Sequence, residues 1–178
     1  MVAEFLFHNI IKVKVFINIK YFLLYPLLLA ACFNAWSDET KNITEILSNT
    51  KVIITDGDTI KFNNKKIRLH GIDTPEIKQL CKNKNGEDYK CGVKAKLALI
   101  NLISSHQVKC SIHGKDRYKR LIATCFVKNI NINEWLVKEG WALAYRKYSK
   151  DYVDEELFAK NNKLGLWKGV FLEPWKWR

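Results

Sequence analysis

The sequence predicts an α+β fold in which about three helices pack on a small five-stranded sheet that closes into a barrel. The first observation is the order of elements, since three β-prone runs precede a helical stretch, two further β-prone runs and then more helices. The second is size, because residues 38–178 carry a net charge of +10 in 141 residues, which fits one domain. Hydrophobic residues make up 48% of the chain, which excludes a disordered basic tail.

The β-prone runs of the first half are short and separated by turn residues. Val52–Thr55 and Thr59–Phe62 flank Asp56-Gly57-Asp58, and Asp-Gly between such runs is a strong hairpin signal. Asn63-Asn64 predicts a second turn, and Ile67–Ile72 alternates apolar positions as a third strand does. These runs therefore predict three consecutive strands.

The second half mixes helices with two more strands. A polar loop bounded by cysteines is expected over Lys78–Lys90, followed by a helix over Gly92–Ser104. The remaining elements are strands over Val108–Ile112 and Leu121–Val127 and helices over Asn133–Gly140 and Tyr152–Lys163. In the last helix, Val153, Leu157 and Phe158 lie on one stripe, which predicts a buried face.

Residues 1–37 have the pattern of a secretory signal peptide. An apolar run over Tyr21–Phe33 follows three lysines, and Ala35-Trp36-Ser37 supplies small residues before a cut at Asp38. Its length is short of the roughly 20 residues of a spanning helix. An uncleaved anchor and a lipoprotein acylated at Cys32 are the alternatives. We expect a protein exported to the periplasm or medium, with residues 38–49 as a linker to a domain over residues 50–178.

Four cysteines remain in the expected domain, namely Cys81, Cys91, Cys110 and Cys125. An even count in an exported chain favours disulfides, for which three pairings are possible. Pairing nearest neighbours closes loops of 11 and 16 residues, and each bond would stabilise the fold by about 3 kcal/mol. A zinc site is the alternative, but the sequence has no Cys-x-x-Cys pair.

Four clusters carry side chains suited to chemistry: Asp56–Thr59, Asp73–Glu76, Asp116–Arg120 and Trp141–Tyr148. Each also has a purely structural explanation. The first fits a hairpin turn, the second a helix start with Thr as cap and Pro in the first turn, and the third a solvated basic turn. In the fourth, aromatic residues alternate with cations, which gives a tyrosine-rich basic surface.

Together the clusters supply what phosphoryl chemistry needs. Asp58 and Asp73 are charged oxygen ligands of the kind that Ca²⁺ prefers, and guanidinium groups pair with phosphate in a bidentate manner. Glu76 is then free to orient or deprotonate water. Arg68 precedes Asp73 by five residues, roughly 16 Å along a straight strand. Both reach one phosphate only if the strand curls near Gly71.

These residues resemble the staphylococcal nuclease (thermonuclease) family over about residues 50–170. The motifs are Asp-Gly-Asp-Thr at 56–59, Arg68 followed by Asp73-Thr74-Pro75-Glu76, and Asp-Arg-Tyr-Lys-Arg at 116–120. The resemblance implies an OB-fold five-stranded β-barrel with about three α-helices. It also implies Ca²⁺-dependent hydrolysis of DNA and RNA phosphodiesters that leaves 3′-phosphate ends.

The resemblance assigns roles residue by residue. Asp58, Asp73 and the carbonyl of Thr74 would be calcium ligands, and Glu76 would be the general base. The two arginines that stabilise the transition state would be Arg68 and Arg120. The residues expected to bind substrate are Arg117, Tyr118 and Tyr145.

Two departures from the family pattern affect these expectations. Lys119 stands where the family has glycine, so a positive φ there would cost about 1–2 kcal/mol and could shift Arg120. The Trp175-Lys176-Trp177 end is additional, and we expect it to pack back on the barrel rather than to contact a membrane.

The leading hypothesis is a monomeric, exported, calcium-dependent nuclease with little sequence specificity. Its partner would be DNA or RNA, and residues 1–37 would be its one membrane contact, if they are retained or lipidated. A basic surface attracts phosphates without reading bases, and aromatic rings favour unpaired bases. The alternatives are a non-catalytic nucleic-acid-binding OB module, which would need neither Glu76 nor both arginines, and a structural lipoprotein tethered at Cys32.

Overall fold

A computed structural model gives the fold of residues 44–47, 52–62 and 64–178, with side chains described in the last two ranges. The expected leader over residues 1–37 lies outside these ranges, as does residue 63 of the expected second turn. Within them, no helix combines the length and apolar character needed to cross a bilayer.

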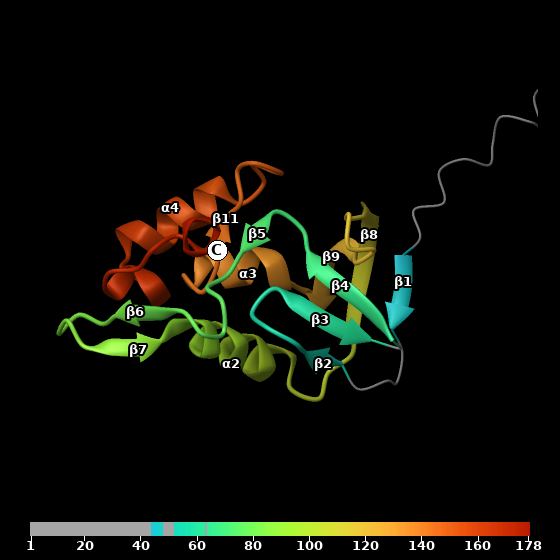
Figure 1. Ribbon diagram of the computed structural model, residues 1–178. Coiled ribbons are helices and arrows are strands. Elements are labelled where there is room, and N and C mark those ends of the chain that lie inside the picture. Colours follow the sequence, from blue (N-terminus) through green and yellow to red (C-terminus); the bar gives the residue numbers. More distant parts are fainter. Residues whose placement is uncertain (1–43, 48–51, 63) are drawn as a thin grey trace, which may run out of the picture. The chain divides into compact units, whose positions relative to one another are not determined.

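One mixed sheet contains most of the strands and lies on the right in Figure 1. Its strand order is β1-β8-β9-β4-β3-β2, and β10 pairs with β9. The pairing of β4 with β9 is parallel, and the other pairings are antiparallel. The strands are β1 (Thr44–Leu47), β2 (Ile53–Ile54), β3 (Thr59–Phe62), β4 (Lys65–Leu69), β8 (Val108–Lys115), β9 (Leu121–Val127) and β10 (Ile130–Asn131). The expected hairpin at Asp56-Gly57-Asp58 joins β2 and β3, and β1 falls within the range expected as a linker.

The third expected strand is broken, as the proposed approach of Arg68 to Asp73 requires. After β4 the backbone turns at Gly71, which has φ +73°, and resumes as β5 (Ile72–Asp73). β5 pairs with β11 (Leu143–Ala144) in a separate two-stranded sheet. A side chain at Gly71 would also approach the ring of Tyr152 to 3.0 Å. The break therefore depends on a glycine for both conformation and space.

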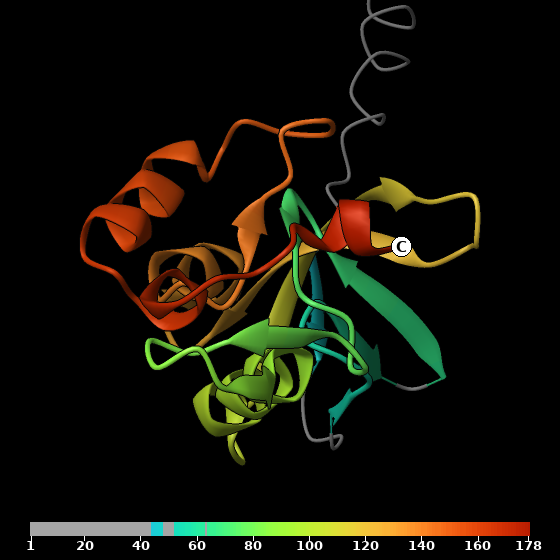
Figure 2. The same cartoon turned by 60° about the vertical axis from the view of Figure 1, so that its left-hand side comes forward.

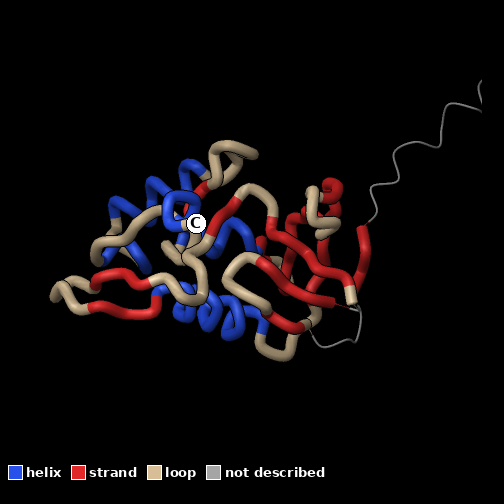
Figure 3. The backbone as a smooth tube through the Cα atoms, viewed as in Figure 1, coloured by secondary structure: helices blue, strands red, loops and turns tan. Residues whose placement is uncertain are grey.

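The helices lie mostly to one side of the strands (Figure 3). They are α2 (Cys91–Ile103), α3 (Ile132–Lys138), α4 (Val153–Asn161), the 3₁₀ turn η2 (Gly165–Lys168) and the short α5 (Pro174–Trp177). Asn131 begins α3 because its side chain accepts hydrogen bonds from the backbone N–H groups of Asn133 and Glu134. The predicted α+β class is confirmed, and the expected strands and helices occur in the predicted sequence with further strands between them.

Two local expectations are wrong. The polar stretch expected as a loop over Lys78–Lys90 contains an antiparallel hairpin, β6 (Leu80–Lys82) with β7 (Asp88–Lys90). In α4, Leu157 and Phe158 are exposed, and the buried residues are Glu156 and Ala159. Glu156 is buried because its carboxylate accepts the Ala144 N–H at 3.0 Å and pairs with Arg146 at 2.5 Å.

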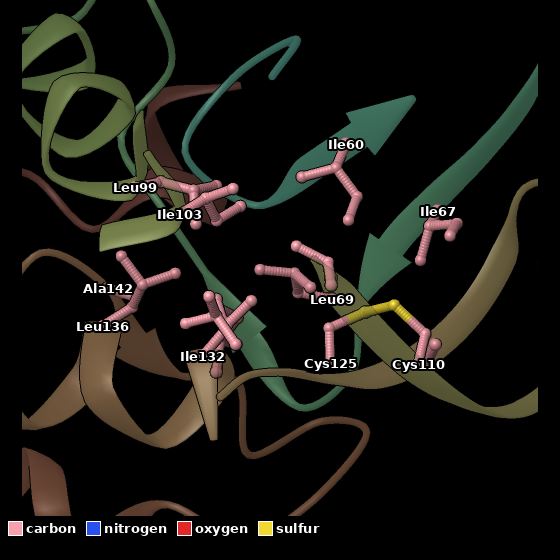
Figure 4. Packing of buried hydrophobic residues seen from close by; sticks show 14 of the residues in the cluster. Ile60, Ile67, Leu69, Leu99, Ile103, Cys110, Cys125, Ile132, Leu136 and Ala142 are labelled. Carbon is pink, nitrogen blue, oxygen red and sulfur yellow. A yellow bond between two sulfur atoms is a disulfide. The ribbon is translucent and has the colours of Figure 1, made fainter. Parts of the chain in front are cut away.

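The buried residues form two clusters, each containing a disulfide. The larger one lies inside the sheet and against α2 and α3, and Figure 4 shows Ile60, Ile67, Leu69 and Leu99 converging there. Cys110–Cys125 joins β8 to β9 in this cluster. Cys81–Cys91 joins the β6–β7 hairpin to α2 in the smaller cluster, which includes Leu143 and Leu166. The nearest-neighbour pairing is thus the one found.

Candidate active site

The turn between β2 and β3 delivers the first carboxylate to a buried position. Asp58 Oδ2 accepts hydrogen bonds from Thr74 N at 2.9 Å and Thr74 Oγ1 at 3.1 Å. This approach requires glycine at position 57, since an added Cβ would lie 2.7 Å from Thr74 Oγ1. The turn is therefore both the hairpin that its sequence suggests and part of a site. No helix begins at Thr74, which follows β5 in extended loop.

Arg68 joins the two carboxylates that sequence reasoning selected as metal ligands. Its Nη1 pairs with Asp58 Oδ1, and its Nη2 contacts Asp73 Oδ1 at 2.5 Å and the carbonyl of Ile72 at 3.3 Å. The side chains of Asp58 and Asp73 are 2% and 0% exposed. Two carboxylates buried this deeply need positive partners, and one guanidinium between them shows that they face the same place.

Asp56 lies in the same turn as Asp58, and its pKa responds to the charges of both predicted arginines. Burial raises the pKa of Asp56, while the charges of Arg68 and Arg120 and hydrogen bonds with Thr59 act in the opposite direction. The contacts that the structure gives Arg120 are with Asp116 and the Tyr118 ring, so only its charge acts on Asp56. Sequence reasoning did not assign Asp56 a role, although its place in the Asp-Gly-Asp motif, one turn with two carboxylates, was an available signal.

The β8–β9 turn holds Arg120 through Asp116. Asp116 Oδ1 accepts from the backbone N–H groups of Tyr118 and Arg120, each at 2.9 Å, and Oδ2 accepts from Arg120 Nε at 2.6 Å. Burial opposes the charge of Asp116, but these bonds from Arg120 and Tyr118 leave its pKa lowered. Lys119 has φ +63°, the left-handed conformation that a glycine would adopt without strain. The two hydrogen bonds from Arg120 to Asp116 nevertheless fix the position of Arg120 in the turn.

The loop after β5 carries Glu76 at the edge of the site. Its backbone is fixed by Gln79, whose Oε1 accepts from Glu76 N at 3.2 Å and whose own N–H donates to the Glu76 carbonyl at 2.8 Å. Gln79 is fully buried, whereas the Glu76 side chain is 34% exposed. A carboxylate that is fixed through its backbone but open to solvent is suited to accept a proton from water.

The predicted substrate-binding residues fall into two groups. Tyr145 directly follows β11 and donates its N–H to the carbonyl of Gly71 at 2.8 Å, which places it beside β5. Arg117 and Tyr118 lie on the β8–β9 turn, where the Tyr118 ring contacts the guanidinium groups of Arg117 at 4.8 Å and Arg120 at 5.5 Å. Tyr118 is 65% exposed, so it lies at the rim rather than among the buried carboxylates.

Sequence reasoning missed a residue that contacts two members of the predicted site. Arg178 donates to Asp73 Oδ2 at 2.6 Å, to Asp73 Oδ1 at 3.2 Å and to Glu76 Oε1 at 2.7 Å. Burial opposes its charge, but the hydrogen bonds to Asp73 and Glu76 raise the pKa of Arg178 above its ordinary value. Figure 1 shows this end of the chain near β5, and Figure 2 shows the red C-terminal helix in front of the green strands. The contact joins residues 105 positions apart, so no local pattern could have indicated it.

The donor set suits a hard divalent cation. Asp58, Asp73 and Thr74 supply only oxygen ligands, and the bonds from Thr74 to Asp58 hold two of the three residues together. The described residues contain no group of three or more His, Cys, Asp or Glu side chains arranged to hold a metal, and the expected set has only two such side chains. In this structure the two buried carboxylates have positive partners in Arg68 and Arg178.

A curved sheet with buried carboxylates and guanidinium groups at one edge defines a phosphodiesterase type of site. The model of the staphylococcal nuclease homologue family matches residues 66–169, more than half of the chain. The chain therefore belongs to the staphylococcal nuclease family, whose domain is an OB-fold. The family and the nuclease-named relatives support an endonuclease or phosphodiesterase.

Several of the curated proteins that this chain resembles carry nuclease names. An uncharacterized endonuclease of Haemophilus influenzae is 35% identical over 91% of this chain and 86% of its own length. The micrococcal nuclease of Shigella flexneri is 31% identical over 81% of this chain and 83% of its own length. The succinoglycan biosynthesis protein ExoI of Rhizobium meliloti is 35% identical over 65% of this chain, and the match spans 62% of that protein.

Proposed function

We propose that the chain is an exported, calcium-dependent nuclease that hydrolyses phosphodiester bonds of DNA or RNA with little sequence specificity. The single observation that carries the proposal is the contact of Arg68 with both Asp58 and Asp73. The pattern of residues 1–37 and two disulfides support export, since disulfides persist in oxidising compartments. A net charge of +12 supports attraction to nucleic-acid phosphates.

In this proposal the buried residues bind and orient, and the exposed carboxylate moves a proton. Asp58, Asp73 and the carbonyl of Thr74 hold a calcium ion, which when bound supplies Lewis-acid polarisation of a phosphoryl oxygen. Glu76 accepts a proton from the attacking water, and Arg68 and Arg120 balance charge on the phosphoryl oxygens. Tyr145 receives a base by stacking, while Arg117 and Tyr118 contact the substrate at the rim.

A non-catalytic OB-fold binder accounts less well for the buried charges. A surface that only binds phosphates gains from arginines, but carboxylates at 2% and 0% exposure would repel the phosphate and cost desolvation. Those carboxylates are useful if a cation lies between them and the substrate. The binder remains an outcome of the experiment below.

The test is cleavage of single-stranded DNA and RNA by the full chain with chelator, and after calcium is restored. We expect chelator to abolish turnover and Glu76→Gln, Arg68→Ala and Arg120→Ala each to lower kcat by about 10²–10³. Lys84→Ala, which removes an exposed charge from the β6–β7 turn, is the control and should stay near the parent. Turnover that persists in chelator contradicts calcium dependence, and binding without turnover in any protein supports the binder.

A further inference from the structure

One segment outside the family match covers the proposed active site. The family model ends at residue 169, and residues 173–178, here called the α5 segment, contain the helix α5 and Arg178. The chain leading to this segment is anchored at two points. Val170 and Lys82 exchange backbone hydrogen bonds of 2.8 and 3.0 Å, and Gln79 Nε2 donates to the carbonyl of Leu172 at 2.7 Å. Gln79 also fixes Glu76, so the segment begins next to the site.

The α5 segment contacts residues to which we assign two different roles, base stacking and metal or proton chemistry. The indole of Trp175 stacks on the ring of Tyr145, with centroids 5.4 Å apart and planes inclined by 4°. That is the ring on which a nucleobase is proposed to stack. Arg178 meanwhile contacts both oxygens of Asp73 and one oxygen of Glu76, the proposed metal ligand and general base.

We infer that the α5 segment is an autoinhibitory element that competes with the divalent cation and with a stacked base. The inference rests on the proposed function. A cation bound by Asp73 would lie close to the guanidinium of Arg178, and two positive groups on one carboxylate repel each other. A base stacked on Tyr145 needs the space that Trp175 occupies. Binding of either ligand therefore favours release of the segment.

The structure also provides for this release. The Arg178 side chain is 39% exposed, and the remaining backbone bonds of the segment are internal, from Lys176 and Trp177 to Glu173 and from Arg178 to Pro174. The segment can therefore leave as a unit beyond the anchor at Leu172, although its release exposes the buried Pro174 and removes Trp175 from the smaller hydrophobic cluster. Lys176 pairs with Glu173 within the same segment at 2.9 Å, so it offers a matched charge control.

The first experiment measures calcium affinity of the full chain by calorimetric titration, without substrate. A competitor that occupies the site in most molecules raises the apparent Kd by the inverse of the free fraction. We expect Arg178→Gln to bind calcium about tenfold more tightly than the parent, a coupling of ordinary size. Trp175→Ala should shift affinity in the same direction, and Lys176→Gln should match the parent. Equal calcium affinity in Arg178→Gln and parent overturns the inference.

The second experiment uses reciprocity. If the segment weakens calcium binding, calcium must loosen the segment to the same extent, so amide exchange of residues 174–178 should speed up on addition of calcium. In chelator, Trp175→Ala should bind a fluorescent single-stranded oligonucleotide more tightly than the parent. Unchanged exchange together with unchanged oligonucleotide binding overturns the inference.

These measurements separate the inference from the proposed function. Tighter calcium binding by Arg178→Gln, with no hydrolysis by any variant, would keep the competition and overturn the nuclease proposal. Hydrolysis with equal calcium affinity in parent and variant would keep the nuclease proposal and overturn the competition. Failure of both proteins to bind calcium overturns calcium competition together with calcium dependence.

Discussion

At the scale of single residues, the site consists of buried carboxylates whose charge is compensated by guanidinium groups. Asp58 and Asp73 are almost fully removed from solvent, and each is paired with Arg68. Losing one partner of such a pair leaves a buried charge without compensation, which is strongly destabilising. The substitutions Asp58→Ala and Arg68→Ala therefore affect folding as well as activity, and kinetic tests of them need a stability measurement beside them.

Lys119 is one of five described non-glycine residues with a positive φ. Its φ of +63° costs a non-glycine residue about 1 kcal/mol, so we expect Lys119→Gly to raise the free energy of unfolding by up to about 1 kcal/mol. Urea denaturation with an unchanged m-value is the measurement. Lys115→Gly, in strand β8 of the same hairpin, is the control and should lower stability. A loss of stability in Lys119→Gly would contradict the prediction.

At the scale of elements, the site is assembled where regular structure stops. Asp73 ends β5, Glu76 lies in the loop after it, Arg120 closes the β8–β9 turn and Tyr145 follows β11. The short pairing of β5 with β11 brings Leu143 opposite Asp73 and Ala144 opposite Ile72. This two-residue ladder fixes the distance between the proposed metal site and the proposed base-stacking ring.

The buried Glu156 of α4 supports that ladder. Its Oε1 accepts the Ala144 N–H, so Glu156→Ala leaves a buried donor without a partner and should lower the free energy of unfolding by about 1–3 kcal/mol. Glu156→Gln retains an acceptor and loses mainly the pair with the half-exposed Arg146, so it should cost less than about 1 kcal/mol. Equal losses in the two variants, measured by urea denaturation, would show that the Ala144 bond is unimportant.

At the scale of the whole molecule, two disulfides and two hydrophobic clusters hold the sheet, the hairpin and the helices together. Cys110–Cys125 crosslinks neighbouring strands inside the larger cluster, whereas Cys81–Cys91 ties the β6–β7 hairpin to the start of α2. The smaller cluster includes Trp175 as a partly buried member. Packing of the α5 segment against the domain, as its tryptophans suggested, is therefore confirmed.

Stability of the whole domain should depend on pH through His70, which lies between β8 and the start of α4. Burial and the neighbouring His113 lower the pKa of His70 below its ordinary value of 6.5, and Asp151 at 3.7 Å acts against them. The unfolded chain therefore binds this proton more readily than the folded chain. Stability is lost as pH falls below about 6.5.

The test is the free energy of unfolding measured from pH 7.5 to 5.5. His70→Gln should lose less stability than the parent over this range, because it has no proton to bind. Asp151→Asn should lose more, because removing the carboxylate lowers the pKa of His70 further. A parent whose stability is constant or rises on acidification would contradict the expected direction.

Some features of this protein follow from the sequence because their causes are local. Asp-Gly between β-prone runs specifies a hairpin turn. The five-residue spacing with a glycine lets Arg68 reach Asp73. The cysteines, 10 and 15 positions apart, pair with their nearest neighbours in the sequence. Spacing explains how Arg68 reaches Asp73, whereas the placement of Asp58 beside them was expected from the family resemblance. The same local signals predicted most strands and helices, but not the β6–β7 hairpin.

Other features were decided only by the tertiary structure, because they depend on partners far away in the chain. A polar stretch forms the β6–β7 hairpin, which is crosslinked to α2 and paired with Val170. Glu156 of α4 is buried because its carboxylate accepts the Ala144 N–H. The contact of Arg178 with Asp73 joins positions 105 residues apart. Hydrophobic periodicity and turn propensity report on near neighbours, whereas a buried charge is satisfied by whichever side chain the fold brings to it.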